Sequence, residues 1–334
     1  MKKLVVFILS LSVIAIAQTI SEVNSFAAPF KNYGWAGNRK IKGWTCGGDA
    51  SIKEYFVRLT PDRQSKSGFC WNDKPLNSNK WLTTVKFRIS GQGETLFGDG
   101  MTIFFTTQNV HTAGPMHGSN DKFIGFSVDL STYRNPEYYR FHRDISLYVG
   151  NNTSESAYYP DREHEGCFSS YRFYEKRQDF SVENAARIQI SYDGDLQRVV
   201  VRSDHNNRGY YDDCFSAKVD LPAEWWRNAY IGVSASTGDL ADNHDVLEIS
   251  TVVGVSSLEN EEAITQKERE DAFRATLAGL LKEEGLEAEK LNPAELALAS
   301  LVKALSDAEL DELEKLKREL EHSMSCREGG NVET

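Results

Sequence analysis

A single carboxylate, Asp99, stands between two glycines just before a run of apolar residues. The sequence Gly98-Asp99-Gly100 permits backbone conformations with positive φ and leaves no bulky side chain beside the acid. A carboxylate presented in this way at the rim of a sheet can accept hydrogen bonds from a polar ligand. Taken alone, the same three residues also describe an ordinary tight turn with an exposed acid.

The element that must position Asp99 is the run that follows it, MTIFF at 101–105. Its residues favour β-structure and are apolar on nearly both faces, which predicts a strand in the middle of a sheet. Between about residues 30 and 255, further segments such as KFRI at 86–89 and RIQI at 187–190 alternate polar and apolar residues, as half-buried antiparallel strands do. The many strands and few helices predict an all-β fold with one large antiparallel sandwich.

The first 17 residues have the pattern of a secretory signal peptide. Two lysines precede an apolar run, and AIA at 15–17 fits a cleavage site. In the oxidising compartment that such a signal implies, five cysteines predict two internal disulfides and one spare thiol, or a bond to another chain. Asn151 and Asn152 begin two overlapping N-glycosylation motifs, which predicts an exposed loop there.

The net charge of −11 is concentrated in the C-terminal part of the chain. From Ser256 onward the sequence has 20 acidic and 10 basic residues, whereas the part before it has 29 and 28. Capping motifs and leucine stripes predict an acidic helical region at 256–322. This region is suited to partner binding or, together with Cys326, to homo-oligomerisation. The last residues, 323–334, are predicted to be a disordered tail. No basic patch points to nucleic acid, and no apolar run after the signal reaches the length of a membrane span.

Several motifs follow one another in a characteristic order over residues 30–255. They are VRLTP at 57–61, Ser65 with Gly68 and Trp71, GDG at 98–100, GVSASTGDL at 232–240 and DNHDVL at 242–247. Together they resemble the L-type (legume-like) lectins of the early secretory pathway. The resemblance implies a concanavalin-like, legume-lectin-like antiparallel β-sandwich (jelly roll) that is not an enzyme. It also implies calcium-assisted binding of high-mannose N-glycans on glycoproteins, for transport between endoplasmic reticulum and Golgi, sorting or quality control.

The resemblance also assigns roles to individual residues. The positions that match the family's sugar-contacting residues are Ser65, Asp99, Asn135, Gly238, Asp239 and Leu240. A carboxylate can accept hydrogen bonds from a pair of mannose hydroxyls, an Asn can donate and accept, and backbone N–H groups can bind sugar oxygens. The family disulfide matches Cys167–Cys214, which leaves Cys46 and Cys70 to pair with each other.

The calcium loop departs from the family pattern. It reads Ser131-Thr132-Tyr133-Arg134-Asn135, so Ser131 stands where the family has an Asp ligand and Arg134 adds a positive charge, and both changes weaken a calcium site. The remaining candidate ligands are Tyr133 and Asn135, with Asp129, Asp161 or Glu163 to supply the missing carboxylate. The family's sugar-contacting His has no counterpart in YYPD at 158–161, and His164 would need a different alignment.

Two interpretations therefore stay open. The chain is a luminal or secreted lectin for high-mannose glycans, or a lectin-fold protein that has lost calcium-dependent sugar binding and serves as a protein-binding or scaffolding module. In the second case the positive charge of Arg134 would stand where the calcium ion stands in the family. A glycoside hydrolase of a related fold would need E-x-D-x-x-E on one strand, a pattern that the sequence lacks. We expect His244, Asp245 and the Trp225-Trp226 pair to be structural.

Overall fold

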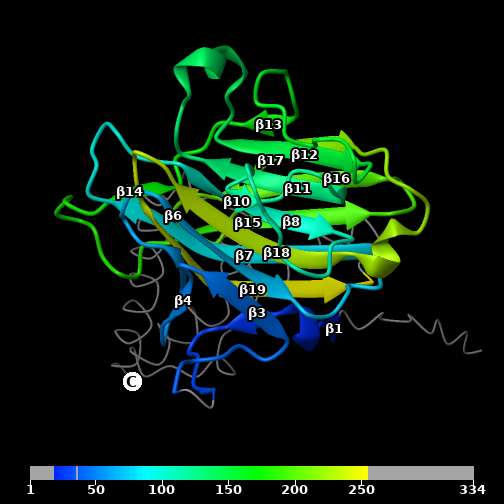
Figure 1. Cartoon of the computed structure of the whole chain (residues 1–334), viewed down its shortest axis with the longest axis horizontal. Coiled ribbons are helices and arrows are strands. Elements are labelled where there is room, and N and C mark those ends of the chain that lie inside the picture. The colour runs from blue at the N-terminus through cyan, green and yellow to red at the C-terminus, as the bar shows by residue number, and fades with distance from the viewer. Residues whose placement is uncertain (1–18, 35–36, 255–334) are drawn as a thin grey trace, which may run out of the picture. The chain divides into compact units, whose positions relative to one another are not determined.

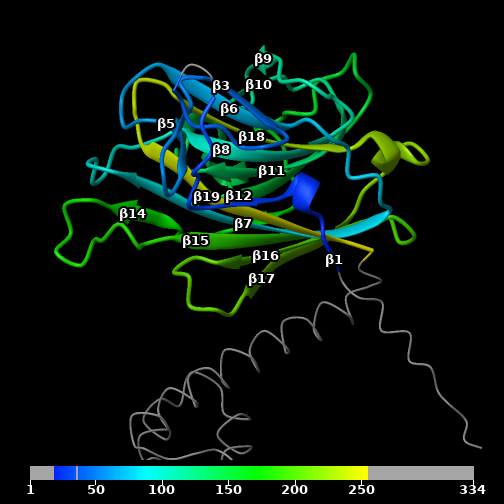
Figure 2. The same ribbon diagram turned by 90° about the horizontal axis from the view of Figure 1, so that it is seen from below.

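The computed structural model describes residues 19–34 and 37–254, which form two large β-sheets stacked face to face (Figures 1 and 2). The predicted signal peptide, the acidic helical region and the tail with Cys326 lie outside these residues. Figure 2 shows the two layers on edge, with β7, β15, β16 and β17 in one and β6, β8, β11 and β18 in the other. The predicted all-β sandwich is confirmed.

The first sheet has β7 and β19 at its centre and is antiparallel apart from one short edge pairing. In spatial order it contains β17 (Asp212–Lys218), β16 (Arg198–Asp204), β15 (Ala186–Asp193), β7 (Lys80–Gly91), β19 (Asn243–Val253), β5 (Val57–Thr60) and β4 (Ser51–Ile52). Three short strands join it: β1 (Thr19–Ile20) and β2 (Phe26–Ala27) on β19, and β14 (Arg172–Tyr174) parallel to β7.

The second sheet carries the strand that follows Asp99. Its spatial order is β13 (Gly166–Cys167), β12 (Ile145–Asn151), β11 (Ile124–Ser131), β8 (Gly100–Thr106), β18 (Tyr230–Thr237), β6 (Lys66–Asn72) and β3 (Trp44–Gly48). The remaining described elements are a small hairpin and three short 3₁₀ helices. They are β9 (Ala113–Gly114), β10 (Gly118–Ser119), η1 (Glu22–Asn24), η2 (Pro136–Phe141) and η3 (Trp225–Asn228). None of the helices described is long and apolar enough to cross a bilayer.

β8 is buried along its whole length, as its apolar sequence predicts. Phe105 belongs to the core between the two sheets, where its ring stacks on Trp81 and Phe126. Phe104, on the opposite face, packs with Phe123 in a second cluster that loops cover from outside. Burying a phenylalanine stabilises the fold by about 1.5–3 kcal/mol, so both faces of β8 anchor the strand that begins at Asp99.

The residues expected to be structural are buried in or against the core. Trp225 packs in the core and donates its indole N–H to the Tyr192 hydroxyl at 2.9 Å, and Trp226 packs against the same cluster. His244 is fully buried, with Nδ1 2.7 Å from the Thr60 hydroxyl, and burial lowers its pKa to about 3, so it stays neutral. Asp245 is also fully buried. The structural roles predicted for these residues are confirmed.

The structure contains both predicted disulfides. Cys46–Cys70 joins the neighbouring strands β3 and β6, whereas Cys167–Cys214 joins β13 at the edge of the second sheet to β17 at the edge of the first. The two cysteines of the second bond are 47 residues apart. Closing a loop of that length in the unfolded chain corresponds to about 4 kcal/mol of loop-closure entropy. The bond therefore holds one side of the sandwich closed.

The chain leaves the second sheet at the end of β12 in a surface loop. Asn151 and Asn152 are both exposed there, as their glycosylation motifs predict, and glycosylation itself stays a prediction. The loop then returns to the sheet, where Ala157 is buried and its N–H donates to the Asp121 carbonyl at 2.7 Å. This return brings residues 158–164 to the end of the sheet at which Asp99 lies.

Candidate functional site

Asp99 is held by its backbone at the start of β8, between the end of β18 and the loop after β11. Its N–H donates to the Ser236 carbonyl at 3.3 Å, and its own carbonyl accepts from the N–H groups of Thr132 and Tyr133 at 2.9 and 3.3 Å. Glycine suits position 98 because a Cβ there would lie 3.0 Å from Tyr133 Cβ, which is tighter than ordinary contact. These backbone bonds fix the position of Asp99, and its carboxylate, which also has a hydrogen bond with Ser236, lines the pocket described below.

The predicted 238–240 loop stands directly beside the Asp99 carboxylate. A Cβ on Gly238 would lie 3.4 Å from both carboxylate oxygens, so glycine keeps the approach to them open. The loop is fixed from the other side by the Ser65 N–H, which donates to the Gly238 carbonyl at 3.1 Å, and by the Gln64 side-chain amide, which donates to the Asp239 carbonyl at 2.6 Å. Ser65, Asp99 and the loop thus come together as predicted, although their sugar contacts stay a prediction.

Asp99 and Asn135 line one pocket of about 310 Å³, which we call the smaller pocket. Apart from two prolines, its other walls are polar or aromatic: Pro115, His117, Asp129, Ser131, Tyr133, Tyr138, His142, Arg143, Ser146, Tyr148, Tyr158, Pro160, His164 and Ser236. The volume lies at the lower end of the range for ligand pockets. Three histidines stand in this lining, His117, His142 and His164, so the pocket has imidazole groups although YYPD at 158–161 has no histidine.

A buried polar chain, which the sequence did not predict, lies beneath Asp99. The Thr102 hydroxyl donates to Asp129 Oδ1 at 2.6 Å, and His117 Nε2 lies 3.2 Å from the same oxygen. Burial opposes protonation of His117, but the nearby charges of Asp129 and Asp99 outweigh it, so the pKa of His117 is raised. The positive charge that His117 can carry therefore lies close to the Asp99 carboxylate.

The Asp99 carboxyl itself is partly desolvated. Burial raises its pKa above the ordinary value of an aspartate, and the charge of Asp239 acts in the same direction. His117 and a hydrogen bond with Ser236 oppose this shift without cancelling it. A carboxylate with few water contacts forms strong hydrogen bonds with a ligand's hydroxyl groups, because less solvation is lost when they bind.

The donor set around the smaller pocket does not fit calcium. Calcium needs six to eight oxygen ligands that include several carboxylates, whereas Asp161 and Glu163 are exposed and line neither pocket. Of the other predicted ligands, Asp129 is engaged by Thr102 and His117, and Asn135 Oδ1 accepts from the Glu137 N–H at 3.0 Å. Over residues 19–34 and 37–254, no three His, Cys, Asp or Glu side chains are grouped so that they could hold a metal ion.

The loop residues Ser131 and Arg134 show what replaces the calcium contacts. The Ser131 hydroxyl donates to the Tyr133 carbonyl at 3.2 Å, so one lone pair of that oxygen is already used within the loop. The Arg134 guanidinium lies 3.2 and 3.4 Å from the two carboxylate oxygens of Asp144 and does not line the smaller pocket. The expectation that Arg134 takes the place of calcium is therefore wrong, because Asp144 draws the side chain to the other side of the loop.

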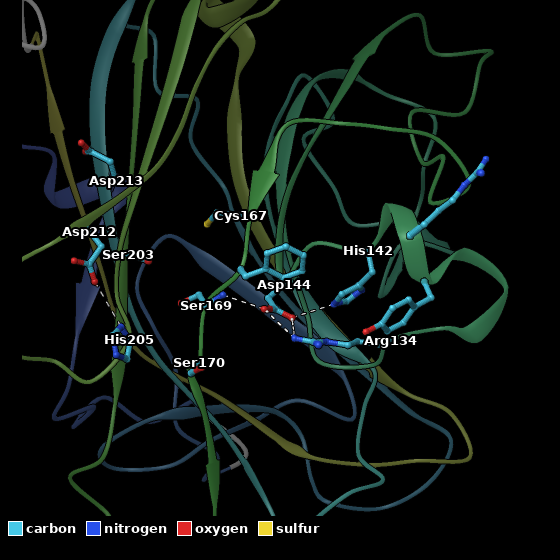
Figure 3. A pocket seen from close by; sticks show the side chains of 13 residues that line it. Arg134, His142, Asp144, Cys167, Ser169, Ser170, Ser203, His205, Asp212 and Asp213 are labelled. Carbon is cyan, nitrogen blue, oxygen red and sulfur yellow. Dashed lines mark hydrogen bonds and ion pairs between the residues drawn. The ribbon is translucent and has the colours of Figure 1, made fainter.

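Asp144 and Arg134 belong to a second hollow of about 620 Å³, the larger pocket (Figure 3). Besides Arg134, Asp144 accepts hydrogen bonds from His142 Nε2 at 3.0 Å and from the Ser169 N–H at 2.9 Å. Burial opposes ionisation of Asp144, but these donors outweigh it and lower its pKa. His142 lines both pockets, so the two hollows adjoin along the segment 131–143.

Comparison with known sequences assigns the whole described region to one family. Residues 17–261 match the family model described as the legume-like lectin family. The chain is 32% identical over 241 residues to the VIP36-like protein of Mus musculus, a match that covers 69% of this chain and 65% of that protein. It is also 32% identical over 225 residues to the vesicular integral-membrane protein VIP36 of Homo sapiens, covering 66% and 59%. The chain thus matches less than two thirds of the length of either relative.

Solved structures show the same fold. The exoplasmic/lumenal domain of VIP36 in its Ca2+/Man2-bound form superimposes with a TM-score of 0.59 at 29% identity, covering 73% of this chain and 93% of that one. Its metal-free form gives a TM-score of 0.60 at 29% identity, covering 72% and 95%. The carbohydrate recognition domain of Emp47p, at 18% identity and a TM-score of 0.54 over 71% and 97%, shares the fold alone.

Proposed function

Because this chain belongs to the legume-like lectin family, we propose that its smaller pocket binds high-mannose N-glycans on glycoproteins. The family and its structural neighbours are lectins, so the prediction that the chain is not an enzyme is confirmed. The observation that carries the proposal is the approach of Gly238 to the desolvated Asp99 carboxylate, beside a pocket that Asn135 also lines. The ligand class is supported by the VIP36 domain, which has been solved with Man, Man2 and Man3GlcNAc bound.

In this proposal the Asp99 carboxylate accepts hydrogen bonds from two adjacent mannose hydroxyls. Asn135 Oδ1 is already occupied by the Glu137 N–H, so the side-chain amide of Asn135 contributes its donors to the sugar. The backbone N–H groups of Asp239 and Leu240 offer further donors. Each hydrogen bond to the charged carboxylate contributes about 1.5–3 kcal/mol, and much of that is offset by ordering of the ligand, which makes binding of a single mannose weak.

We also propose a luminal or secreted location for this activity. The first 17 residues have the features of a signal peptide, the chain has two disulfides, and relatives are named as vesicular proteins. Transport, sorting or quality control of glycoproteins is the role that fits such a lectin. Homo-oligomerisation through the predicted C-terminal helical region and Cys326 stays a prediction on residues outside those described.

A protein-binding module without sugar binding is the second candidate function. The poor fit of the loop 131–135 to calcium favours it, because the VIP36 domain has been solved with both Ca2+ and Man2 bound. A glycan array probed with the full chain, with and without chelator, separates the two. The lectin proposal expects retention on high-mannose glycans. If no mannoside binds in either condition, the lectin proposal fails and the second candidate remains.

Mannoside binding is expected to be insensitive to calcium. Because the donor set does not fit the ion, the affinity for methyl α-mannoside should change by less than about twofold in the presence of chelator. Calorimetry with calcium alone should show no stoichiometric binding. Asp161→Asn and Glu163→Gln should leave both measurements unchanged. Stoichiometric calcium binding that either substitution removes would contradict this prediction and restore those residues as ligands.

Mannoside binding is expected to weaken as the pH falls. The loss should begin at a higher pH than it would if the accepting carboxylate were an exposed aspartate. Only ionised Asp99 accepts from two hydroxyls, and burial raises its pKa, so its neutral form becomes populated at a higher pH than that of an exposed aspartate. Affinity should therefore be full near neutral pH and fall as the pH drops through the raised pKa, by about tenfold for each further unit. Calorimetric titrations from pH 7 to pH 4 measure this. A flat profile would exclude Asp99 as the titrating acceptor.

A further inference from the structure

The proposed function leaves the larger pocket without a role. Figure 3 shows two facing walls, with Arg134, His142 and Asp144 on one side and Ser203, His205, Asp212 and Asp213 on the other. Between them lie Cys167, at the end of the short strand β13, and Ser169 and Ser170, which follow that strand. The pocket is about twice the volume of the smaller one, at about 620 against 310 Å³.

The polar groups of the larger pocket favour a neutral ligand with many hydroxyls. Each carboxylate in its lining has a basic partner: Asp144 has Arg134, Asp212 has Arg208 at 2.7 Å and Asp213 has Arg202 at 2.9 Å. The charges of these three pairs cancel, and Arg140 adds one positive charge to the lining, while lone pairs and N–H groups still face the hollow. A surface with many donors and acceptors and little net charge suits a sugar better than an ion or a phosphate.

Two exposed aromatic side chains stand at the same pocket. Tyr139 and Phe168 are 64% and 65% exposed, so most of each ring is open to solvent. Both belong to the lining, Tyr139 from η2 and Phe168 from the turn after β13. An exposed ring offers a flat apolar face to the C–H side of a pyranose while neighbouring polar groups bind its hydroxyls. Aromatic and hydroxyl-binding groups thus occur together here.

The segment 131–143 connects the two pockets. Ser131, Tyr133 and Asn135 face the smaller pocket, Arg134 and Tyr139 face the larger one, and His142 lines both. A branched glycan with one mannose at Asp99 would hold its other arm close to this segment. The second contact would then be intramolecular and would benefit from a high effective concentration.

We propose that the larger pocket is a second saccharide subsite, which binds a neutral hexose on another arm of the glycan held at Asp99. This inference rests on the proposed function of the smaller pocket. Tyr139 stacks on the sugar, and Ser170 and the carboxylates of Asp144 and Asp212 bind its hydroxyls. The subsite gives the chain a preference for branched glycans over single mannose residues.

The test compares two ligands on the full chain by calorimetry: methyl α-mannoside and a branched high-mannose N-glycan. Tyr139→Ala removes the ring, and Ser170→Trp fills the pocket from an exposed position, so neither change disturbs the core. We expect both variants to lose about five- to tenfold in affinity for the branched glycan and to keep the wild-type affinity for methyl α-mannoside. Tyr55→Ala, at a tyrosine that is 63% exposed and lies in neither pocket, is the matched control.

The outcomes separate this inference from the function on which it rests. If wild type binds both ligands and both variants keep the wild-type affinity for the branched glycan, the second subsite is wrong and the lectin function stands. Equal losses of affinity for the two ligands would also overturn the subsite. Such a result would mean that Tyr139 and Ser170 act by supporting the structure of the smaller pocket. If wild type binds neither ligand, both the proposed function and the second subsite are wrong.

Discussion

Asp99→Asn is expected to lower the affinity for methyl α-mannoside by about 30- to 150-fold. The substitution removes the negative charge to which two sugar hydroxyls donate, and it replaces one acceptor oxygen with an N–H donor. One hydrogen bond is therefore lost and the other is weakened. Losing one charge-assisted hydrogen bond corresponds to about 2–3 kcal/mol. The fold should be unaffected, since Asp99 is held through backbone bonds to Ser236, Thr132 and Tyr133. Calorimetry measures the affinity, and circular dichroism checks the fold.

The matched control for Asp99→Asn is Asp161→Asn. Both replace a carboxylate with its amide, but Asp161 is exposed and lines neither pocket, so its substitution should leave the affinity unchanged. A second variant tests access to the carboxylate rather than its charge. Gly238→Val places a branched side chain whose Cβ lies 3.4 Å from both Asp99 oxygens and should also abolish binding. Wild-type affinity in Asp99→Asn would show that sugar binding occurs elsewhere.

Asp245→Ala is expected to destabilise the protein by about 3–5 kcal/mol, the largest effect on stability that we predict. Asp245 is fully buried and accepts from Arg58 Nε at 2.7 Å and from Arg88 at 2.7 Å, which links β19 to its neighbours β5 and β7. Removing the carboxylate leaves the Arg88 guanidinium, whose side chain is 6% exposed, without a counter-charge in the interior. Urea denaturation of wild type and variant measures the difference in the free energy of unfolding.

An exposed ion pair provides the comparison for Asp245. Asp179 and Arg177 are joined at 2.7 Å, but both side chains are about two-thirds exposed, at 67% and 65%. Water replaces the lost partner at such a site, so Asp179→Ala should cause no measurable change in the unfolding curve. Asp245→Asn keeps the shape and one acceptor and should fall between wild type and Asp245→Ala. Equal stability of Asp245→Ala and Asp179→Ala would exclude the buried pair as a determinant of the fold.

The sheets of this protein are predictable from sequence because their residues carry a local signal. The run 101–105 is apolar on both faces, and the structure buries β8 on both faces. Lys86 and Arg187 alternate with apolar neighbours, and their strands pair with those two residues opposite each other. The order of the strands across a sheet has no such local signal, because it depends on pairings between segments far apart in the chain.

The site is predictable only in part, for a related reason. Asp99 and the 238–240 loop lie in recognisable motifs, whereas the chain from Thr102 through Asp129 to His117 does not. Asp129 lies opposite Thr102 only in the register of β8 and β11, and His117 arrives from a loop without periodicity. The direction of Arg134 was missed because Asp144, ten residues later, determines it.

The larger pocket is not predictable from the sequence, because it forms where segments far apart in the chain meet. Its lining comes from residues 134–144, 167–170 and 203–213, which belong to different strands and loops of both sheets. Serines, an exposed tyrosine and paired carboxylates are common on any surface, so their types alone indicate nothing. Only their arrangement around one hollow distinguishes them.

The Cys167–Cys214 bond has a consequence for when this hollow exists. Cys167 lies between the two walls of the larger pocket, and its bond joins β13 to the edge strand β17, which carries Asp212 and Asp213. The wall on β17 is thus held beside β13 by a covalent link, which forms only after the chain has entered an oxidising compartment. Recognition of a second glycan arm would then be acquired during maturation, and newly made, still-reduced copies would discriminate poorly between single mannose residues and branched glycans.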